Sequence, residues 1–151
     1  ESFRTPLLVY LPGGRHGDVD AMVQNIDHAP TFLELAGAEV PADIQGVSYL
    51  PLLQGKKPRG WRRSLYYHYY EYPAEHSVCK HYGVRTKRYA LIHFYDDIDT
   101  WELYDLEKDP EQMHNIYGQP GTEKITKQLR EELHRLQEQY DDPIRFTLSD
   151  N

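Results

Sequence analysis

The chain has few cysteines, no long apolar run and no excess of basic residues. Its 151 residues include one cysteine, Cys79, so no disulfide can form within the chain. No apolar run approaches the roughly 18–20 residues that cross a bilayer. Acidic residues outnumber basic ones by 24 to 17, which argues against general binding to nucleic-acid phosphates. With 39% hydrophobic and 13% aromatic residues, we expect a globular protein with no nucleic-acid and no membrane partner.

Short catalytic motifs are also missing. The sequence contains no Gly-x-Ser-x-Gly elbow, no P-loop, no His-Glu-x-x-His and no Cys-x-x-Cys. Cys79 is followed by Lys80 and His81, but nothing else near it favours a reactive thiolate over an inert thiol. We therefore assign no catalytic residue to this chain from a local motif.

The first third of the sequence predicts the end of a larger α/β domain. Residues 7–11 (LLVYL) form an apolar run between two prolines, typical of a strand buried on both faces of a parallel sheet. Only a short further strand is predicted, near residues 21–25, so we expect the partner strands to lie outside this chain. Helices are predicted at 27–37, with Asp27 or His28 near the N-cap, and at 49–54. The basic segment around residues 56–63 marks the predicted boundary between a domain at 1–60 and a subdomain at 61–151.

The remainder predicts an antiparallel sheet covered by a helix. Strands are predicted at 65–72, 81–86, 89–95 and 101–106, because these segments are rich in aromatic and branched residues. The two-residue link Lys87-Arg88 implies a hairpin. From 122 to 140, apolar residues recur every three or four positions, which indicates a helix lying across the sheet. The predicted fold class is α/β, with an α+β C-terminal lobe of about four antiparallel strands and a C-terminal helix.

Residues 66–86 (YYHYYEYPAEHSVCKHYGVRT) concentrate tyrosine, histidine and charge. This composition has three interpretations: a metal site, a ligand-contacting surface, or a plainly exposed sheet. Strand parity places His68 on one face with Tyr66 and Tyr70 and turns Glu71 to the other face, which disfavours a metal site. Tyrosine rings stack on sugars, and Arg and Lys hold sulfate, carboxylate or phosphate groups. The candidate substrate-binding residues are His68, Glu71, His76, Lys80, His81 and Arg85.

Five segments, taken together and in their order along the chain, are informative. They are RTPLLV at 4–9, NIDHAPTFLELAG at 25–37, QGVSYLPLLQG at 45–55, VRTKRYALI at 84–92, and ELYDLEKDPE at 102–111 with Asn115 after it. Each pattern alone is weak. Together they resemble the C-terminal part of the type I, arylsulfatase-like sulfatases of the alkaline phosphatase superfamily. Residues 66–86 also resemble bacterial sulfatases that act on 6-O-sulfated N-acetylglucosamine.

The resemblance implies a hydrolase of sulfate esters on glycans whose catalytic centre belongs upstream of Arg4. The family's Cys/Ser-x-Pro-x-Arg signature, which matures to formylglycine, has no match here, and Cys79 lacks the proline and arginine of that motif. Calcium, or another divalent cation, is expected in the full-length enzyme, with its ligands absent from this chain. The implied partners are a sulfated glycan and the missing N-terminal part of the sulfatase domain. The implied location is periplasmic or extracellular, and the isolated chain is predicted to be inactive.

Two alternatives stay open at the level of the sequence. One is a stand-alone, non-catalytic module for glycan binding or protein interaction, derived from a sulfatase. The other is a phosphate-ester hydrolase of the same superfamily, which the Glu-Leu-Tyr-Asp-Leu pattern disfavours. If residues 7–11 lack their parallel neighbours, their exposed apolar flank is predicted to promote dimerisation or non-native pairing.

Overall fold

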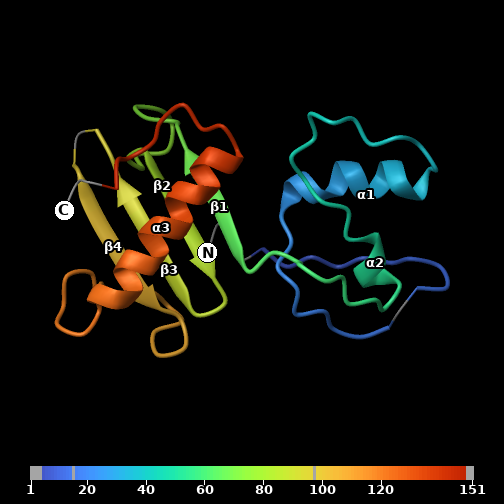
Figure 1. Ribbon diagram of the computed structural model, residues 1–151, viewed down its shortest axis with the longest axis horizontal. Coiled ribbons are helices and arrows are strands. Elements are labelled where there is room, and N and C mark those ends of the chain that lie inside the picture. Colours follow the sequence, from blue (N-terminus) through green and yellow to red (C-terminus); the bar gives the residue numbers. More distant parts are fainter. Residues whose placement is uncertain (1–4, 15, 97, 149–151) are drawn as a thin grey trace. The chain divides into compact units, whose positions relative to one another are not determined.

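The computed structural model describes residues 5–14, 16–96 and 98–148. The chain divides into two units, residues 1–62 and residues 63–151, which differ in their secondary structure (Figure 1). Within the described residues, no helix is both long enough and apolar enough to cross a membrane. That the first unit is the end of an α/β domain, and the second its C-terminal subdomain, stays a prediction at this point.

The first unit consists of loops around a 3₁₀ turn, η1 (Asn25–Asp27), and two helices, α1 (His28–Leu35) and α2 (Leu50–Leu53). Both helices were predicted from the sequence, with slightly wider bounds. Gly37 has a φ of 67°, a conformation that side-chain-bearing residues avoid, and it ends α1 as predicted. The short strand predicted near residues 21–25 is wrong, because this segment leads directly into the 3₁₀ turn.

Asp27 organises the first unit. Its fully buried carboxylate accepts hydrogen bonds from the backbone N–H groups of Gln24 and Val47, at 2.8 Å each. Both of its oxygens also pair with the guanidinium of Arg62, with Nη2 2.7 Å from Oδ1. Asp27 precedes α1, as predicted, but its side chain holds the preceding turn and the distant residues Val47 and Arg62, and it does not cap the helix.

Gly46 allows the segment before α2 to lie against the start of α1. A Cβ atom at this position would fall 2.0 Å from the carbonyl oxygen of Ile26, so any side chain would collide with backbone. Three residues later, the backbone N–H of Tyr49 donates to the Thr31 hydroxyl at 3.0 Å. The QGVSY segment therefore serves to pack one stretch of backbone against another.

Residues 7–11 form no strand in the described structure. Leu8 is 90% exposed and Tyr10 87% exposed, although the sequence predicted a strand buried on both faces. A strand needs hydrogen-bonding neighbours, whereas the backbone hydrogen bond seen here among the described residues is a turn contact, from the N–H of Gly14 to the carbonyl of Leu11 at 2.9 Å. The prediction of a buried strand is therefore wrong for this chain taken alone. Arg4, at the start of the run, lies outside the described residues.

The second unit is an antiparallel sheet with a helix across one face (Figure 1). Its elements are β1 (Ser64–Tyr69), β2 (His81–Thr86), β3 (Tyr89–Phe94), β4 (Thr100–Asp105) and α3 (Glu123–Gln139). The strands follow one another in the sheet in sequence order, so the predicted meander and helix are confirmed. β1 ends at Tyr69, earlier than predicted, because Tyr69 pairs with His81, the first residue of β2.

The core of this unit lies between the sheet and α3. Leu91 and Leu103 of neighbouring strands and Leu133 of the helix are completely buried there. Burying a leucine side chain contributes about 1.5–3 kcal/mol, so this layer is a major source of stability. Leu129 and Leu136 lie in the same layer, which confirms the predicted apolar stripe.

The ELYDL segment and Asn115 hold the edge of the sheet. The side-chain oxygen of Asn115 accepts the backbone N–H of Leu103 at 2.9 Å, and its amide donates to the carbonyl of Trp101 at 3.1 Å. At the other end of β4, Asp105 forms an ion pair with Arg88 at 2.9 Å. Asp105 of the ELYDL segment and Asn115 therefore stabilise the fold around β4.

Candidate functional site

His68 lies in a buried group of polar and aromatic side chains at one end of the sheet. Its Nδ1 is 2.6 Å from a carboxylate oxygen of Asp142, and its Nε2 is 2.6 Å from the hydroxyl of Tyr95. The ring stacks on Tyr70 with 3.7 Å between the ring centroids. Tyr66 donates a hydrogen bond to the same oxygen of Asp142 at 2.5 Å. The side chains of His68 and Asp142 are 3% and 2% exposed, so this group is closed to a substrate.

The environment fixes the charges in this group. Burial lowers the pKa of His68, although Asp142 acts in the opposite direction. Burial would raise the pKa of Asp142, but hydrogen bonds from His68 and Tyr66 hold it below its ordinary value. At neutral pH the pair is therefore a neutral imidazole beside a carboxylate. Because a carboxylate only accepts hydrogen bonds, Nδ1–H of His68 donates to Asp142 and Nε2 accepts from the Tyr95 hydroxyl. Burial raises the pKa of Tyr95 to about 12.

His81 and Arg85 lie on the opposite face of the sheet from His68. The register pairs Tyr69 with His81 and His68 with Tyr82, so the two histidines lie on opposite faces. His81 is buried between aromatic rings, stacked on Tyr69 at 5.3 Å, and its Nδ1 donates to the carbonyl of Cys79 at 2.8 Å. Arg85 is half-buried further along the same strand face.

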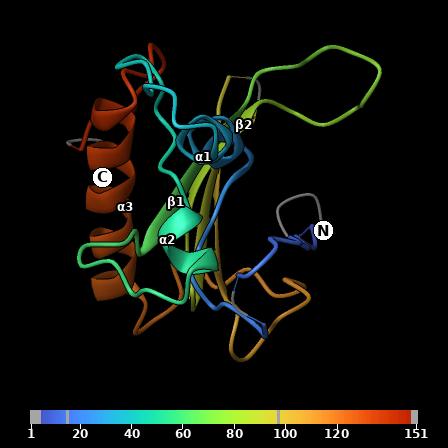
Figure 2. The same ribbon diagram turned by 90° about the vertical axis from the view of Figure 1, so that its right-hand side faces the viewer.

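The β1–β2 connection, residues 70–80, projects beyond the end of the sheet (Figure 2). Glu71 and His76 are exposed in this loop, and so is Glu75 between them. Lys80, at the end of the loop, forms an ion pair with Asp96 at 3.1 Å. The loop therefore presents acidic, basic and imidazole groups to solvent beside an exposed aromatic ring, Tyr70.

The six candidate residues do not form one cluster. His68 faces the helix side of the sheet, His81 and Arg85 face the other side, and Glu71, His76 and Lys80 belong to the loop or its end. Their role in binding a substrate stays a prediction. Sequence reasoning missed Asp142 and Tyr95 as partners of His68. An acidic Asp-Asp-Pro segment after the last helix was the only sign of Asp142, and it did not indicate the contact.

A divalent metal has no set of ligands in the part of the chain that the structure describes. No three His, Cys, Asp or Glu side chains there come together in an arrangement that could hold an ion. The donor groups present do not fit a metal centre, so no chemical step is assigned to a metal on this chain.

A comparison with models of known protein families identifies the family of this chain. The family model described as "N-sulphoglucosamine sulphohydrolase, C-terminal" covers residues 1–139. The chain belongs to this family. The sequence resemblance to the C-terminal part of sulfatases is therefore confirmed.

Curated relatives of this sulphohydrolase C-terminal domain include several bacterial sulfatases. An N-acetylglucosamine-6-O-sulfatase from Bacteroides thetaiotaomicron is 51% identical over 146 residues, which is 94% of this chain and 26% of the relative. A Delta 4,5-hexuronate-2-O-sulfatase from the same organism is 35% identical over 70% of this chain and 21% of the relative. The chain thus spans about a quarter of the length of the relatives it matches.

Solved structures agree with this family. The structure of BT4656 in complex with its substrate, D-glucosamine-2-N,6-O-disulfate, superposes with a TM-score of 0.76 at 52% identity, over 83% of this chain and 25% of that one. A phosphonate monoester hydrolase from Silicibacter pomeroyi gives a TM-score of 0.75 at 25% identity, over 93% of this chain and 29% of that one. These sulphohydrolase C-terminal domain relatives confirm the predicted α/β fold class.

A further relative names the superfamily. The multifunctional alkaline phosphatase superfamily protein PehA from Trinickia caryophylli is 33% identical over 80% of this chain and 26% of its own length. Proteins of this superfamily generally use divalent metal ions. The predicted membership of the alkaline phosphatase superfamily is confirmed. Calcium as the particular divalent ion stays a prediction.

Proposed function

We propose that the whole protein is a sulfatase that removes 6-O-sulfate from N-acetylglucosamine or glucosamine units of glycans. One observation carries this proposal: 51% identity to an N-acetylglucosamine-6-O-sulfatase across 94% of the chain. The matched residues include the β1–β2 region, where the exposed polar groups lie. The structure of a relative with bound D-glucosamine-2-N,6-O-disulfate supports the same class of substrate.

In this proposal the chain shapes the substrate site and does not cleave the ester. Glu71, His76 and Lys80 carry groups that hydrogen-bond to sugar hydroxyls or to a sulfate, and they lie in or beside a projecting loop. The formylglycine signature has no counterpart among the 151 residues. We place the nucleophile and the divalent cation, with calcium as the first candidate, in the rest of the protein. We also propose a periplasmic or extracellular location, which follows from the class of substrate.

The experiment compares two substrates on the full-length protein. N-acetylglucosamine 6-sulfate should be hydrolysed, and His76→Ala should lower its kcat/KM by about tenfold while 4-nitrophenyl sulfate turnover changes little, since the small ester lacks the sugar. Glu107→Gln, which alters an exposed acid far along the chain from the loop, is the matched control. No turnover of any sugar sulfate, or equal losses on both substrates, would contradict the proposal.

We also propose that residues 7–11 pair with the missing part of the domain. The high exposure of Leu8 and Tyr10 supports this, because such a run rarely stays in contact with water. The isolated chain should then associate through this segment, and sedimentation should show a shift toward monomer in a Leu8→Lys, Tyr10→Lys variant. A monomeric wild-type chain would remove the support for pairing.

A further inference from the structure

The β1–β2 loop, residues 70–80, is held to the sheet at both of its ends. Inside the loop the backbone hydrogen bonds are local. The N–H of Tyr72 donates to the Tyr70 carbonyl at 3.0 Å, and that of Val78 donates to the His76 carbonyl at 2.7 Å. Figure 2 shows the loop extending away from the ends of the strands. Local bonds turn the chain without fixing it to the sheet, so the position of the loop depends on the contacts at its ends.

The buried pair of His68 and Asp142 holds the start of the loop. The ring of Tyr70, the first loop residue, stacks on the His68 imidazole with 3.7 Å between the ring centroids. The hydroxyl of Tyr70 also donates to a carboxylate oxygen of Asp142 at 3.3 Å. The two ring nitrogens of His68 bond to Asp142 and to Tyr95, each at 2.6 Å. The imidazole on which Tyr70 rests is therefore fixed from two sides.

Tyr95 connects the same pair to the end of the loop. Its hydroxyl bonds to Nε2 of His68, and its backbone N–H donates to the carbonyl of Lys80 at 3.3 Å. The ring of Tyr95 is packed on Tyr82 of β2, with 5.3 Å between the ring centroids. One buried histidine thus links the first and the last residue of the loop, and both links run through tyrosines.

We propose that His68, Asp142 and Tyr95 form a clamp that positions the β1–β2 loop to bind the glycan. Side chains locked by packing and hydrogen bonds hold a site in place more precisely than a free loop does. A loop that is ordered before the substrate arrives also loses less conformational entropy on binding. The glycan as the ligand follows from the proposed function, on which the clamp's role in specificity rests.

The clamp residues act through the loop, because they are closed to the substrate. The side chains of His68 and Asp142 are 3% and 2% exposed, and Tyr95 is 7% exposed. Asp142 follows α3 and lies far from the loop in sequence, yet it contacts both His68 and Tyr70. The segment after the last helix therefore contributes to substrate specificity as a positioning element.

The first measurement follows the loop in the full-length protein. A glutamyl endopeptidase cleaves after Glu71 or Glu75 when the loop opens, so the rate of this cleavage reports how firmly the ends are held. Tyr70→Leu removes the stacked ring and should raise the rate about fivefold, as expected for the loss of an aromatic pair. Tyr70→Phe keeps the ring and should be cleaved like wild type. Unchanged cleavage in Tyr70→Leu would overturn the clamp.

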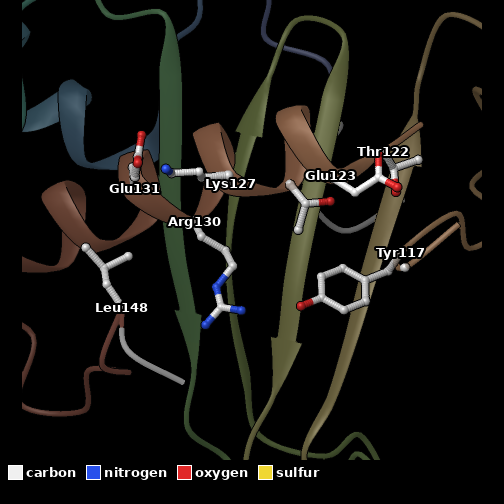
Figure 3. Close-up of a pocket in the computed structure, with 9 residues that line it drawn as sticks. Tyr117, Thr122, Glu123, Lys127, Arg130, Glu131 and Leu148 are labelled. Atoms are coloured by element: carbon white, nitrogen blue, oxygen red, sulfur yellow. The ribbon is translucent and has the colours of Figure 1, made fainter. Parts of the chain in front are cut away.

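Tyr117→Leu is the matched control for this measurement. Tyr117 stacks on Trp101 with 5.8 Å between the ring centroids, and it lines a cavity of about 610 Å³ beside the first half of α3 (Figure 3). Neither the clamp residues nor the six candidate residues line this cavity. The variant removes a similar ring from the same unit, so the loop should be cleaved at the wild-type rate. Loop cleavage as fast as in Tyr70→Leu would indicate general loosening and would count against the clamp.

The second measurement separates positioning from direct contact with the sugar. Because Tyr95 is buried, Tyr95→Phe can affect the sugar only through the loop. It should raise KM for N-acetylglucosamine 6-sulfate about threefold, with kcat and 4-nitrophenyl sulfate turnover near wild type. Tyr104→Phe removes a similarly buried hydroxyl, which donates to Glu102 at 2.9 Å, and should leave KM unchanged. Equal KM values for the two variants would contradict the positioning role.

Failure of the proposed function is recognised separately. A wild-type protein that hydrolyses no sugar sulfate would overturn the proposed function, and with it the glycan as the ligand of the loop. The cleavage rates of Tyr70→Leu and Tyr117→Leu do not depend on turnover, so they would still confirm or overturn the clamp.

Discussion

His68 of the first strand and Asp142 of the C-terminal segment form a buried pair, 2.6 Å apart, across 74 residues of sequence. The backbone N–H of Ile144 also donates to Asp142, at 2.8 Å, so the carboxylate fixes the segment that follows α3. Gln137, on the last turns of the helix, donates to the carbonyl of Ile144 at 3.1 Å. The C-terminal segment is therefore tied to the sheet and to the helix by polar contacts.

Replacing Asp142 should destabilise the fold strongly. Asp142→Ala leaves the His68 and Tyr66 donors buried without this acceptor, and each buried donor left unsatisfied costs about 1–3 kcal/mol. Urea denaturation followed by circular dichroism measures the free energy of unfolding. Asp141→Asn is the matched control, because Asp141 is exposed and pairs only with Arg145 in the described structure. A loss below about 1 kcal/mol for Asp142→Ala would mean that the pair does not hold the segment.

Stability should fall as the pH drops below the ordinary pKa of histidine. Burial lowers the folded-state pKa of His68, and of His93, below the ordinary histidine value of 6.5, so the unfolded chain binds protons more readily. By linkage, this contribution is fully present above about pH 6.5 and is lost as the pH falls toward the folded-state pKa. Urea midpoints measured at successive pH values should show the loss. His68→Gln should flatten the dependence, whereas His76→Gln in the exposed loop should leave it unchanged.

Gly83 should not tolerate a side chain. A Cβ atom there would lie 2.6 Å from the carbonyl oxygen of Leu91 and 2.8 Å from the hydroxyl of Tyr67, which packs across the glycine. We expect Gly83→Ala to cost about 1–3 kcal/mol in unfolding free energy, since the strands must move apart. Adding Tyr67→Phe removes only the contact with the hydroxyl and should recover little, because the Leu91 carbonyl and the ring carbon Cε1 of residue 67, 2.9 Å from the added Cβ, both remain. Full recovery by Tyr67→Phe would show that only the phenol matters.

The sheet and the last helix could be predicted because their patterns are local. Four segments rich in aromatic and branched residues and the two-residue link Lys87-Arg88 define neighbouring antiparallel strands. The apolar stripe that ends at Tyr140 defines the face of the helix that covers them. Parity also placed His68 correctly on the face that it shares with Tyr66 and Tyr70. In each case the residues that interact are close in sequence or follow a fixed period.

The first unit and the buried polar group could not be predicted in the same way. The apolar run at residues 7–11 has the same composition whether its neighbours are present or absent, so its exposure could be predicted only on the condition that those neighbours are missing. Asp142 and Tyr95 reach His68 from distant parts of the chain, and no periodic pattern marks such contacts.

The ion pair of Asp27 and Arg62 should dominate the stability of the first unit. Arg62 donates to both oxygens of the Asp27 carboxylate, which has no access to water. Among the described residues of this unit there is no apolar layer comparable to the one beneath α3. Arg62→Met keeps much of the side-chain volume but leaves the Asp27 charge with only two backbone donors, at a cost of about 3–5 kcal/mol. Hydrogen exchange of the α1 amides should then increase, while those of the β strands stay protected. Arg63→Met, at the neighbouring exposed position, should change neither, and unchanged α1 exchange in Arg62→Met would contradict a structural role for the pair.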